Sequence, residues 1–397
     1  MSATGIVELA AGREGPALGR HPWVFSGGIR RQDEGLEPGQ TVRVVDTRGE
    51  YVATGLFNPH SQIRVRLYRW DDGPLDEAFF RARIAEAVAL RTDTLGLDDP
   101  NGGARLVFSE ADGLSGLVVD RYGPYLTLQL TSLALERRSP WLLDALQDAV
   151  RPEAIVLRTE KGVLEEEGLR LADSVVRGHA PAGPIEIREG GLAFGVALET
   201  GQKTGFYLDQ RINRARAATY ANGRSVADVC CYSGAFGIAA LHAGATRAVG
   251  VDVSQGALEL ASSNARRNDV QDRHEVVRSD AFKWLAEQAD AGARYGMIVL
   301  DPPRFARSRR GVPEALKAYR RLNGLAIQCL EPGGILVTCS CSGRVGLNDF
   351  LGAVGRASAD TGRAVRVIER LGQGPDHPVS ATCAETEYLK CLICYVA

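Results

Sequence analysis

The 397-residue sequence predicts an α/β fold in its C-terminal half, preceded by a small β-rich domain and a small α+β domain. Strand-like and helix-like runs alternate from about residue 186 onward, which is typical of a doubly wound parallel sheet. Two polar motifs at residues 301–305 and 338–342 each follow directly after an apolar, strand-like run. The chain is also too long for one ordinary domain. We therefore expect three domains, at residues 1–72, 73–185 and 186–397.

The N-terminal domain is predicted from short strands that Gly and Pro residues separate. Strands are expected at residues 5–9, 41–46, 51–56 and 62–68. In the last of these, Arg64 and Arg66 alternate with apolar residues, which predicts one cationic face. With Arg20 and the neighbouring His21 and Trp23, this face suggests an RNA-binding surface, whereas the alternative is a solvated strand face beside a core tryptophan.

The central domain is predicted to be α+β and shows no catalytic cluster. Asp112-Gly113 and the Tyr-Gly-Pro at residues 122–124 indicate hairpin turns. The expected helices are 75–95 and 140–150, and the expected strands are 105–108, 116–120, 125–130 and 154–157.

The C-terminal domain is predicted to contain seven strands. The Gly- and Pro-rich residues 372–378 leave no room for a helix before the last strand, so the last two strands are expected to pair antiparallel at the sheet edge. Seven strands with a reversed last one are the arrangement of class I, Rossmann-like methyltransferases. The expected strands are 226–230, 247–251, 275–277, 297–300, 335–338, 365–369 and 387–396.

Bulk properties restrict the location and the partners. The sequence has no apolar run long enough to span a membrane and no signal-peptide pattern, so we expect a cytoplasmic protein with no membrane partner. A net charge of −2 means that any nucleic acid must bind through local basic patches. All eight cysteines lie at or beyond Cys230, without zinc-finger spacing, and we expect no metal site.

Acidic residues follow the first three expected strands of the C-terminal domain. Asp228, Asp252 and Asp280 should meet at the edge where ligands bind in open α/β sheets. The loop at residues 228–237 has glycines but lacks the full dinucleotide motif, so a cofactor without phosphates fits better. We predict S-adenosylmethionine, with Asp252 on the ribose and Asp280 on the adenine. The alternative for Asp280 is a helix N-cap.

The two polar motifs supply an acid, Asp301, and a thiol, Cys341, to the same edge of the sheet. An acid that binds a base edge, together with a thiol that attacks a ring carbon, suits the methylation of carbon 5 of a pyrimidine. Cys339 lies on the same strand face and competes for the role of nucleophile, but Cys341 lies further beyond the strand end. A buried cysteine that serves as a small apolar side chain is the alternative for either.

The motifs at residues 201–211, 301–305, 340–342 and 376–378, with the stretch 109–122, resemble the bacterial large-subunit ribosomal RNA cytosine-5 methyltransferases with an N-terminal PUA domain. The resemblance spans nearly the whole chain. It implies a PUA domain, a small α+β domain and a methyltransferase domain, large-subunit (23S) ribosomal RNA as partner, and Cys341 as nucleophile. The expected catalytic residues are Cys341 and Asp301, and the expected cofactor contacts are Asp228, Tyr232, Ser233, Gly234, Phe236, Asp252, Asp280, Asp301 and Pro302.

Two alternatives remain open, an RNA methyltransferase acting on an exocyclic amine and a non-catalytic RNA-binding protein on a methyltransferase fold. The first needs no thiol, and the second needs no intact acids. A homodimer is a further expectation. Residues 304–321 contain seven cations against Glu314, which predicts either a solvated helix face or an RNA-backbone contact. These cations are Arg304, Arg307, Arg309, Arg310, Lys317, Arg320 and Arg321.

Overall fold

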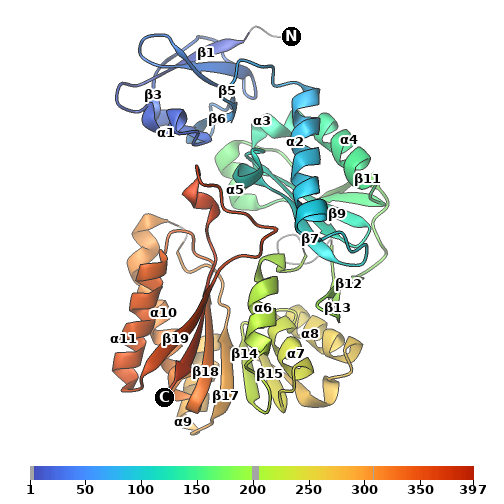
Figure 1. Cartoon of the computed structure of the whole chain (residues 1–397), viewed down its shortest axis with the longest axis vertical. Coiled ribbons are helices and arrows are strands. Elements are labelled where there is room, and N and C mark those ends of the chain that lie inside the picture. The colour runs from blue at the N-terminus through green and yellow to red at the C-terminus, as the bar shows by residue number, and fades with distance from the viewer. Residues whose placement is uncertain (1–3, 199–204, 307) are drawn as a thin grey trace. The chain divides into compact units, whose positions relative to one another are not determined.

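The described residues form four β-sheets, with six, five, two and seven strands (Figure 1). The computed structural model describes residues 4–198, 205–306 and 308–397. Two units have dense internal contacts. The first unit comprises residues 1–185, 196–206 and 375–386, and the second comprises residues 186–195, 207–374 and 387–397. The domain boundaries expected at residues 72 and 185 remain predictions.

The six-stranded sheet belongs to the first unit and has the order β2-β6-β5-β4-β1-β3. Only the pair of β1 and β4 is parallel. Apolar side chains of these strands form a small core of their own. The elements are β1 (Gly5–Leu9), α1 (Gly15–Leu18), β2 (Trp23–Phe25), β3 (Ile29–Gln32), β4 (Thr41–Val45), β5 (Tyr51–Phe57) and β6 (Ile63–Arg69).

The prediction that Arg66 lies on an exposed cationic face of β6 is wrong. Its guanidinium is buried and donates to Oε1 of Glu167 at 2.8 Å and to Oγ of Ser115 at 3.0 Å. A third acceptor is Oε1 of Glu110 at 3.3 Å. Alternation correctly separates the two faces of the strand, but residues from elsewhere in the first unit cover the face that carries Arg66. Its charge is therefore used inside the protein, whereas Arg20 is exposed.

The five-stranded sheet, also in the first unit, has the order β11-β10-β9-β8-β7. Helices α2 and α4 pack against each other and contribute to the core of this sheet. The helix predicted over residues 75–95 ends at Ala89 and continues as a π-helical turn to Thr94. The elements are α2 (Glu77–Ala89), β7 (Gly103–Phe108), β8 (Leu117–Tyr122), β9 (Tyr125–Leu130), α3 (Leu133–Glu136), α4 (Ser139–Val150), β10 (Ala154–Leu157), α5 (Lys161–Glu167) and β11 (Ser174–Gly178).

The Asp-His-Pro motif at residues 376–378 is part of the first unit. Asp376 is fully buried, and its Oδ2 accepts a hydrogen bond from the backbone N–H of Arg105 at 3.0 Å. Its carbonyl accepts a hydrogen bond from Arg91 at 2.8 Å. Residues 199–204, which contain part of the motif at 201–211, lie outside the described residues.

The two-stranded sheet joins β12 (Ile185–Glu189) and β13 (Leu192–Val196). Within the second unit, Glu189 accepts two hydrogen bonds of 2.8 Å from Arg214 of helix α6 (Arg211–Ala218). The backbone N–H of Gly195 donates to Oδ1 of Asn264 at 2.8 Å. These contacts tie the hairpin to the helices of the second unit.

The seven-stranded sheet of the second unit has the order β16-β15-β14-β17-β18-β20-β19. Strand β20 runs antiparallel to both of its neighbours, and the other pairs are parallel. This confirms the predicted class I methyltransferase fold. The strands are β14 (Ser225–Val229), β15 (Arg247–Asp252), β16 (His274–Arg278), β17 (Tyr295–Leu300), β18 (Leu330–Ser340), β19 (Val365–Leu371) and β20 (Lys390–Val396).

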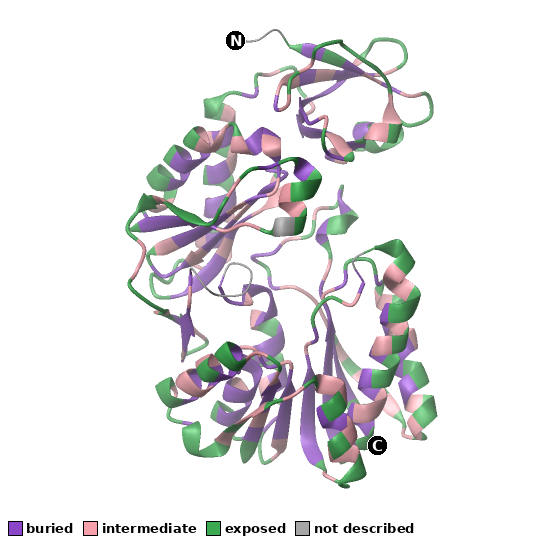
Figure 2. Cartoon of the chain, turned by 180° about the vertical axis from the view of Figure 1, so that it is seen from behind, coloured by how far each residue is buried: buried purple, intermediate pink, exposed green. Residues whose placement is uncertain are grey.

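Helices flank this sheet, and its central strands are buried while the outer helix faces are exposed (Figure 2). Strand β18 begins five residues before the expected Ile335, because a register irregularity opposite Tyr295 and Met297 of β17 accommodates the glycines at its start. The remaining helices are α7 (Ala235–His242), α8 (Gln255–Arg267), α9 (Ala281–Asp290), α10 (Val312–Gln328) and α11 (Leu347–Thr361). Among the described residues, no helix has the length and hydropathy needed to cross a bilayer.

Candidate functional site

The loop between β14 and α7 has an unusual backbone. Cys230 and Tyr232 adopt φ angles of 64° and 47°, and Gly234 adopts 73°. The left-handed region is unfavourable for non-glycine residues, so the surrounding structure must hold this conformation. At Gly234 a side chain would also meet Ala261 of α8, because an added Cβ would lie 3.0 Å from the Ala261 Cβ. The loop is thus tightly shaped at the carboxyl end of the first strand, where ligands bind in such sheets.

Asp228 lies below this loop, on β14, and is almost completely buried. Its Oδ2 accepts a hydrogen bond from the backbone N–H of Gly237 at 2.9 Å, and its Oδ1 has no partner among the described residues. Burial raises the pKa of this carboxyl to about 7, and the nearby charges of Asp301 and Asp252 add to the increase. The orphan oxygen and the raised pKa are typical of a functional site.

Asp252 is the last residue of β15 and contacts the loop directly. Its Oδ2 accepts from the backbone N–H of Tyr232 at 3.0 Å, and its Oδ1 accepts from that of Ser254 at 2.9 Å. A carboxylate oxygen has a second lone pair, so both oxygens can still accept from a ligand hydroxyl.

Asp280 acts as the N-cap of α9, as the alternative interpretation expected. Its Oδ1 accepts from the backbone N–H groups of Phe282 and Lys283 at 3.0 and 3.1 Å. The residue is exposed. Capping uses one carboxylate oxygen, so it does not exclude a ligand contact through the other.

The remaining predicted cofactor contacts line or support the same loop. The ring of Tyr232 meets that of Tyr207 edge-on, with 5.3 Å between the centroids. Ser233 is buried, and its carbonyl accepts from Nδ2 of Asn264 at 3.0 Å. Phe236 is buried within α7.

The structure brings the four predicted acids together around one thiol. Burial raises the pKa of Cys230, and the charges of Asp252, Asp301, Asp228 and Asp280 raise it further. Such a concentration of carboxylates repels phosphate and favours a cation. The residues therefore fit S-adenosylmethionine, which has a positively charged sulfonium and no phosphate.

The motif at residues 301–305 follows β17, the neighbour of β14. The backbone N–H of Asp301 donates to the carbonyl of Val229 at 3.3 Å, so this acid starts beside the cofactor loop. Pro302 is buried, and Phe305 packs against Tyr319 of α10 with 4.8 Å between the ring centroids. The aromatic contact fixes the far end of the motif.

Cys341 comes directly after β18 and is half-buried. Its thiol lies 3.8 Å from the carbonyl oxygen of Pro302, as a weak sulfur hydrogen bond. Because β17 and β18 pair in parallel, with Leu300 opposite Thr338, the acid and the thiol leave the sheet side by side. The structure thus brings Asp301 and Cys341 together.

Cys339 has a different environment. It lies inside β18, is fully buried, and stands opposite Cys391 of β20. A hydrogen bond with Cys391, together with burial, raises the pKa of its thiol well above the usual range. A thiol in this environment is a poor nucleophile, because the thiolate is the reactive form. Cys391 and Cys394 are also buried in the core.

Two polar residues near Cys341 were not predicted as site residues. Burial raises the pKa of Tyr207, and the charges of Asp301 and Cys341 contribute to the increase. Lys390 is buried in β20, and the charge of Cys341 acts on it as well. The sequence contained a signal for each, since Tyr207 lies within the motif at 201–211 and Lys390 interrupts an apolar strand.

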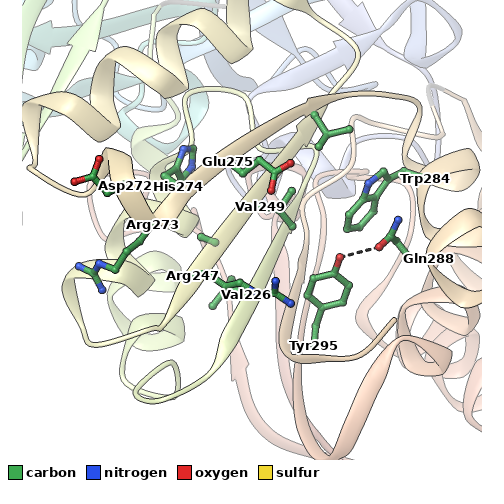
Figure 3. Close-up of a pocket in the computed structure, with 12 residues that line it drawn as sticks. Val226, Arg247, Val249, Asp272, Arg273, His274, Glu275, Trp284, Gln288 and Tyr295 are labelled. Atoms are coloured by element: carbon green, nitrogen blue, oxygen red, sulfur yellow. Dashed lines mark hydrogen bonds between the residues drawn. The ribbon is translucent and has the colours of Figure 1, made fainter. Parts of the chain in front are cut away.

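A pocket of the second unit lies away from this site. It has a volume of about 440 Å³ and lies between the first residues of β14 to β16 and helix α9. Figure 3 shows its lining, where the hydroxyl of Tyr295 donates to Oε1 of Gln288 at 2.9 Å. None of the predicted site residues lines it. Ligands of such sheets bind at the opposite, carboxyl ends of the strands, so this pocket does not define the function.

In the described part of the chain, one group of residues has side chains close enough to hold a metal ion, namely His21, Cys383 and Glu385 of the first unit. The side chains of this group already contact one another through hydrogen bonds. Nε2 of His21 lies 3.2 Å from Oε2 of Glu385, and Nδ1 accepts from the backbone N–H of Trp23 at 3.2 Å. A neutral imidazole with this pair of bonds has no lone pair left for a metal.

Comparison with known proteins agrees with the geometry. The family model described as S-adenosylmethionine-dependent methyltransferase matches residues 172–393, and the model of a PUA-like domain matches residues 7–70. A solved structure from Streptococcus mutans, described as a SAM-dependent methyltransferase, aligns with a TM-score of 0.84 at 17% identity, covering 98% of this chain and 99% of the other. A methyltransferase complexed with SAH aligns with a TM-score of 0.85 at 18% identity and the same coverage. These two likenesses concern the fold.

Sequence relatives are much closer. The ribosomal RNA large subunit methyltransferase I of Photobacterium profundum is 41% identical over 397 residues, which cover 99% of this chain and 100% of the relative. The protein of the same name from Escherichia coli is 40% identical over 390 residues, which cover 98% of each chain. The chain therefore belongs to the ribosomal RNA large subunit methyltransferase I family of S-adenosylmethionine-dependent methyltransferases.

Proposed function

We propose that this protein methylates carbon 5 of a cytosine in large-subunit ribosomal RNA through a covalent adduct between Cys341 and carbon 6 of the base. The observation that carries the proposal is the placement of Cys341 beside the Asp301–Pro302 turn at the carboxyl ends of two paired strands. The large-subunit RNA substrate comes from the family to which the chain belongs.

The proposed site residues divide into two groups. Asp252 accepts hydrogen bonds from the ribose hydroxyls and Asp280 from the adenine amino group, while the loop of Tyr232, Ser233 and Gly234 shapes the pocket. Phe236 supports this loop from inside α7, and Pro302 closes the pocket beside Asp301. When bound, S-adenosylmethionine supplies an electrophilic methyl group on a sulfonium.

Cys341 and Asp301 act on the base. Carbon 5 of cytosine is a poor nucleophile, and attack of the Cys341 thiolate at carbon 6 makes it electron-rich. The carboxylate of Asp301 accepts a hydrogen bond from the exocyclic amino group at the N3 edge of the flipped cytosine. After carbon 5 accepts the methyl group, its proton leaves to a base and the electron pair of that bond expels the thiolate. Carbon 6 thereby returns to the aromatic ring and Cys341 is regenerated.

Cys339 is not proposed as the nucleophile. Its burial and its hydrogen bond with Cys391 disfavour the thiolate form. Arg304 follows the two prolines of the motif at residues 301–305, the proline motif. Many RNA cytosine-5 methyltransferases have a second cysteine at this position, so here no thiol at that position assists product release.

RNA contact is proposed for the start of the basic segment. Arg304, within the proline motif, and Arg309 and Arg310, shortly after it, are exposed. In contrast, Arg320 donates to Asp360 at 2.5 Å and Lys317 to Glu314 at 2.8 Å, so these two cations have acidic partners. Arg307 lies outside the described residues.

In the first unit, exposed Arg20 and Phe25 offer a charge and an aromatic ring to RNA. A cytoplasmic location and a homodimer remain predictions.

The test is to map methylated cytosines in ribosomal RNA from cells with and without this protein. We expect one 5-methylcytosine of the large-subunit RNA to be lost in its absence. RNA containing 5-fluorocytosine should also form a stable covalent complex with the protein and S-adenosylmethionine, because fluorine blocks the final loss of the carbon-5 substituent. Methylation of an exocyclic amine without any trapped complex would instead support the amine-methylating alternative.

A further inference from the structure

Lys390 is a buried cation in an otherwise apolar strand. It begins β20, is followed by a run of buried residues, and is only 6% exposed. Its backbone stands opposite Ser340, the last residue of β18 and the residue before Cys341. Burying an ammonium group without partners is costly, so its position requires polar neighbours.

The ammonium group of Lys390 contacts the backbone of Ser342, the residue after Cys341. Nζ of Lys390 donates to the carbonyl of Ser342 at 2.9 Å and to the carbonyl of Tyr388 at 3.0 Å. An ammonium group has three donors, so these two bonds leave one more. Lys390 therefore fixes the backbone immediately after Cys341.

Ser342 is also held from the opposite side. Its hydroxyl lies 3.3 Å from the hydroxyl of Tyr319 and accepts from the backbone N–H of Ala306 at 3.4 Å. Ala306 follows the proline motif directly. The turn that carries Cys341 is thus clamped between β20 and the proline motif, and Lys390 is the charged member of the clamp.

Apart from Lys390, three described titratable groups near Cys341 do not favour a thiolate. Asp301 is an acid, and Tyr207 and Tyr319 are phenols whose pKa values burial raises, to about 12 for Tyr319. Burial lowers the pKa of Lys390, while the charges of Glu387 and Cys341 act in the opposite direction. A thiolate beside a carboxylate needs a cation to offset the repulsion.

We infer that Lys390 is the positioning residue that holds Cys341 in place and stabilises its thiolate form through the charge of its ammonium group. The inference rests on the proposed role of Cys341 as the nucleophile. The thiol proton passes to water, and Lys390 keeps its own proton throughout.

The experiment measures how fast iodoacetamide alkylates Cys341 as a function of pH, with the Cys341 peptide quantified by mass spectrometry. Lys390→Gln removes the charge and keeps a donor for the two carbonyls, whereas Lys390→Arg keeps the charge. We expect alkylation at pH 7 to slow about tenfold in Lys390→Gln, because a rise of about one in the pKa of the Cys341 thiol lowers the thiolate fraction tenfold. In Lys390→Arg the rate should remain within about threefold of the wild-type rate. Lys283→Met, on the exposed face of α9, is the control for loss of a remote lysine.

Two outcomes would overturn the inference. One is a pH profile of Lys390→Gln that superimposes on the wild-type profile. The other is equal slowing in Lys390→Gln and Lys390→Arg, which would assign a purely structural role. S-adenosylmethionine affinity, measured by calorimetry, should stay within about twofold of wild type in both variants, which verifies that they fold.

The failure of this inference is distinguishable from the failure of the proposed function. If wild-type protein traps 5-fluorocytosine RNA but the alkylation profile does not respond to Lys390, only the role of Lys390 is lost. If alkylation responds to Lys390 but the wild type traps no RNA, Lys390 still controls the thiol and the covalent mechanism is wrong.

Discussion

The backbone N–H of Tyr232 donates a 3.0 Å hydrogen bond to Oδ2 of Asp252, and this bond ties the loop after β14 to the end of β15. The positive φ of Tyr232 is part of the same arrangement. A strained loop held by the acid of the adjacent strand is pre-organised before any ligand binds. Asp252 therefore shapes the loop, and in the proposed cofactor site it also presents lone pairs to the ribose.

The first prediction concerns this acid. Asp252→Ala should weaken S-adenosylmethionine binding by about 1.5–3 kcal/mol, because hydrogen bonds to a charged group are lost. Calorimetric titration measures the change, with Asp290→Ala, an exposed acid at the end of α9, as the matched control. Equal affinities of the two variants would remove Asp252 from the cofactor site.

The second prediction separates the two candidate thiols. Cys341→Ala should abolish both methyl transfer and the trapping of 5-fluorocytosine RNA, while cofactor affinity stays nearly unchanged. Cys339→Ala should remain active and trap RNA, with about 1 kcal/mol lower stability from a small cavity. Gel analysis of the trapped complex gives the answer. Trapping that survives in Cys341→Ala and disappears in Cys339→Ala would reverse the assignment.

The third prediction concerns the buried carboxyl of Asp228. Its pKa is about 7 in the folded state, against an ordinary value of 3.8. The folded state thus binds this proton more tightly than the unfolded state, so the stabilisation is complete below about pH 4 and is lost as the pH rises through 7. Between pH 4 and 8 the free energy of unfolding of the wild type should fall by up to about 4 kcal/mol relative to that of Asp228→Asn.

Urea unfolding of the cofactor-free protein at a series of pH values measures this difference. The comparison with Asp228→Asn is needed because His274 has the opposite dependence. Burial lowers its pKa to about 4, so its contribution is lost as the pH falls below 6.5. Parallel stability curves for the wild type and Asp228→Asn would show that Asp228 does not titrate as described.

The fourth prediction concerns the buried ion pairs of Arg66. Arg66→Met should lower the free energy of unfolding by about 3–5 kcal/mol, because it leaves the buried carboxylate of Glu167 and the half-buried carboxylate of Glu110 without their cation. Arg30→Met is the control in the same sheet, since Arg30 is exposed beside Glu8, and it should cost less than about 1 kcal/mol. Chemical unfolding measures both. A cost for Arg66→Met as small as that of the control would mean that the network adds no stability.

The fifth prediction tests the RNA contact of the basic segment. The double variant Arg309→Ala, Arg310→Ala should bind RNA more weakly, with the slope of log affinity against log salt reduced by about 2. Arg320→Ala should leave the slope nearly unchanged, because Asp360 already neutralises Arg320. Filter binding over a range of salt concentrations measures the slopes. Equal slopes for the double variant and Arg320→Ala would assign the basic segment to a solvated helix face.

The sequence by itself determined the fold class and the acidic edge of the sheet. Parallel strands joined by helices bring their carboxyl ends to one edge, so Asp228, Asp252, Asp280 and Asp301 had to approach one another once the strands were recognised. In the structure, the charges of all four acids raise the pKa of the Cys230 thiol. The sequence suffices here because each strand can be predicted from its own few residues.

Only the tertiary structure decided which side chains become partners across long stretches of sequence. Arg66 is buried because Glu110 and Glu167, 44 and 101 residues away, supply its acceptors. Cys339 differs from Cys341 because β20 places Cys391 opposite it, and Lys390 reaches the turn after Cys341 from the same strand. The alternation of a strand defines two faces, but the packing of distant segments decides which face is buried and which charges meet.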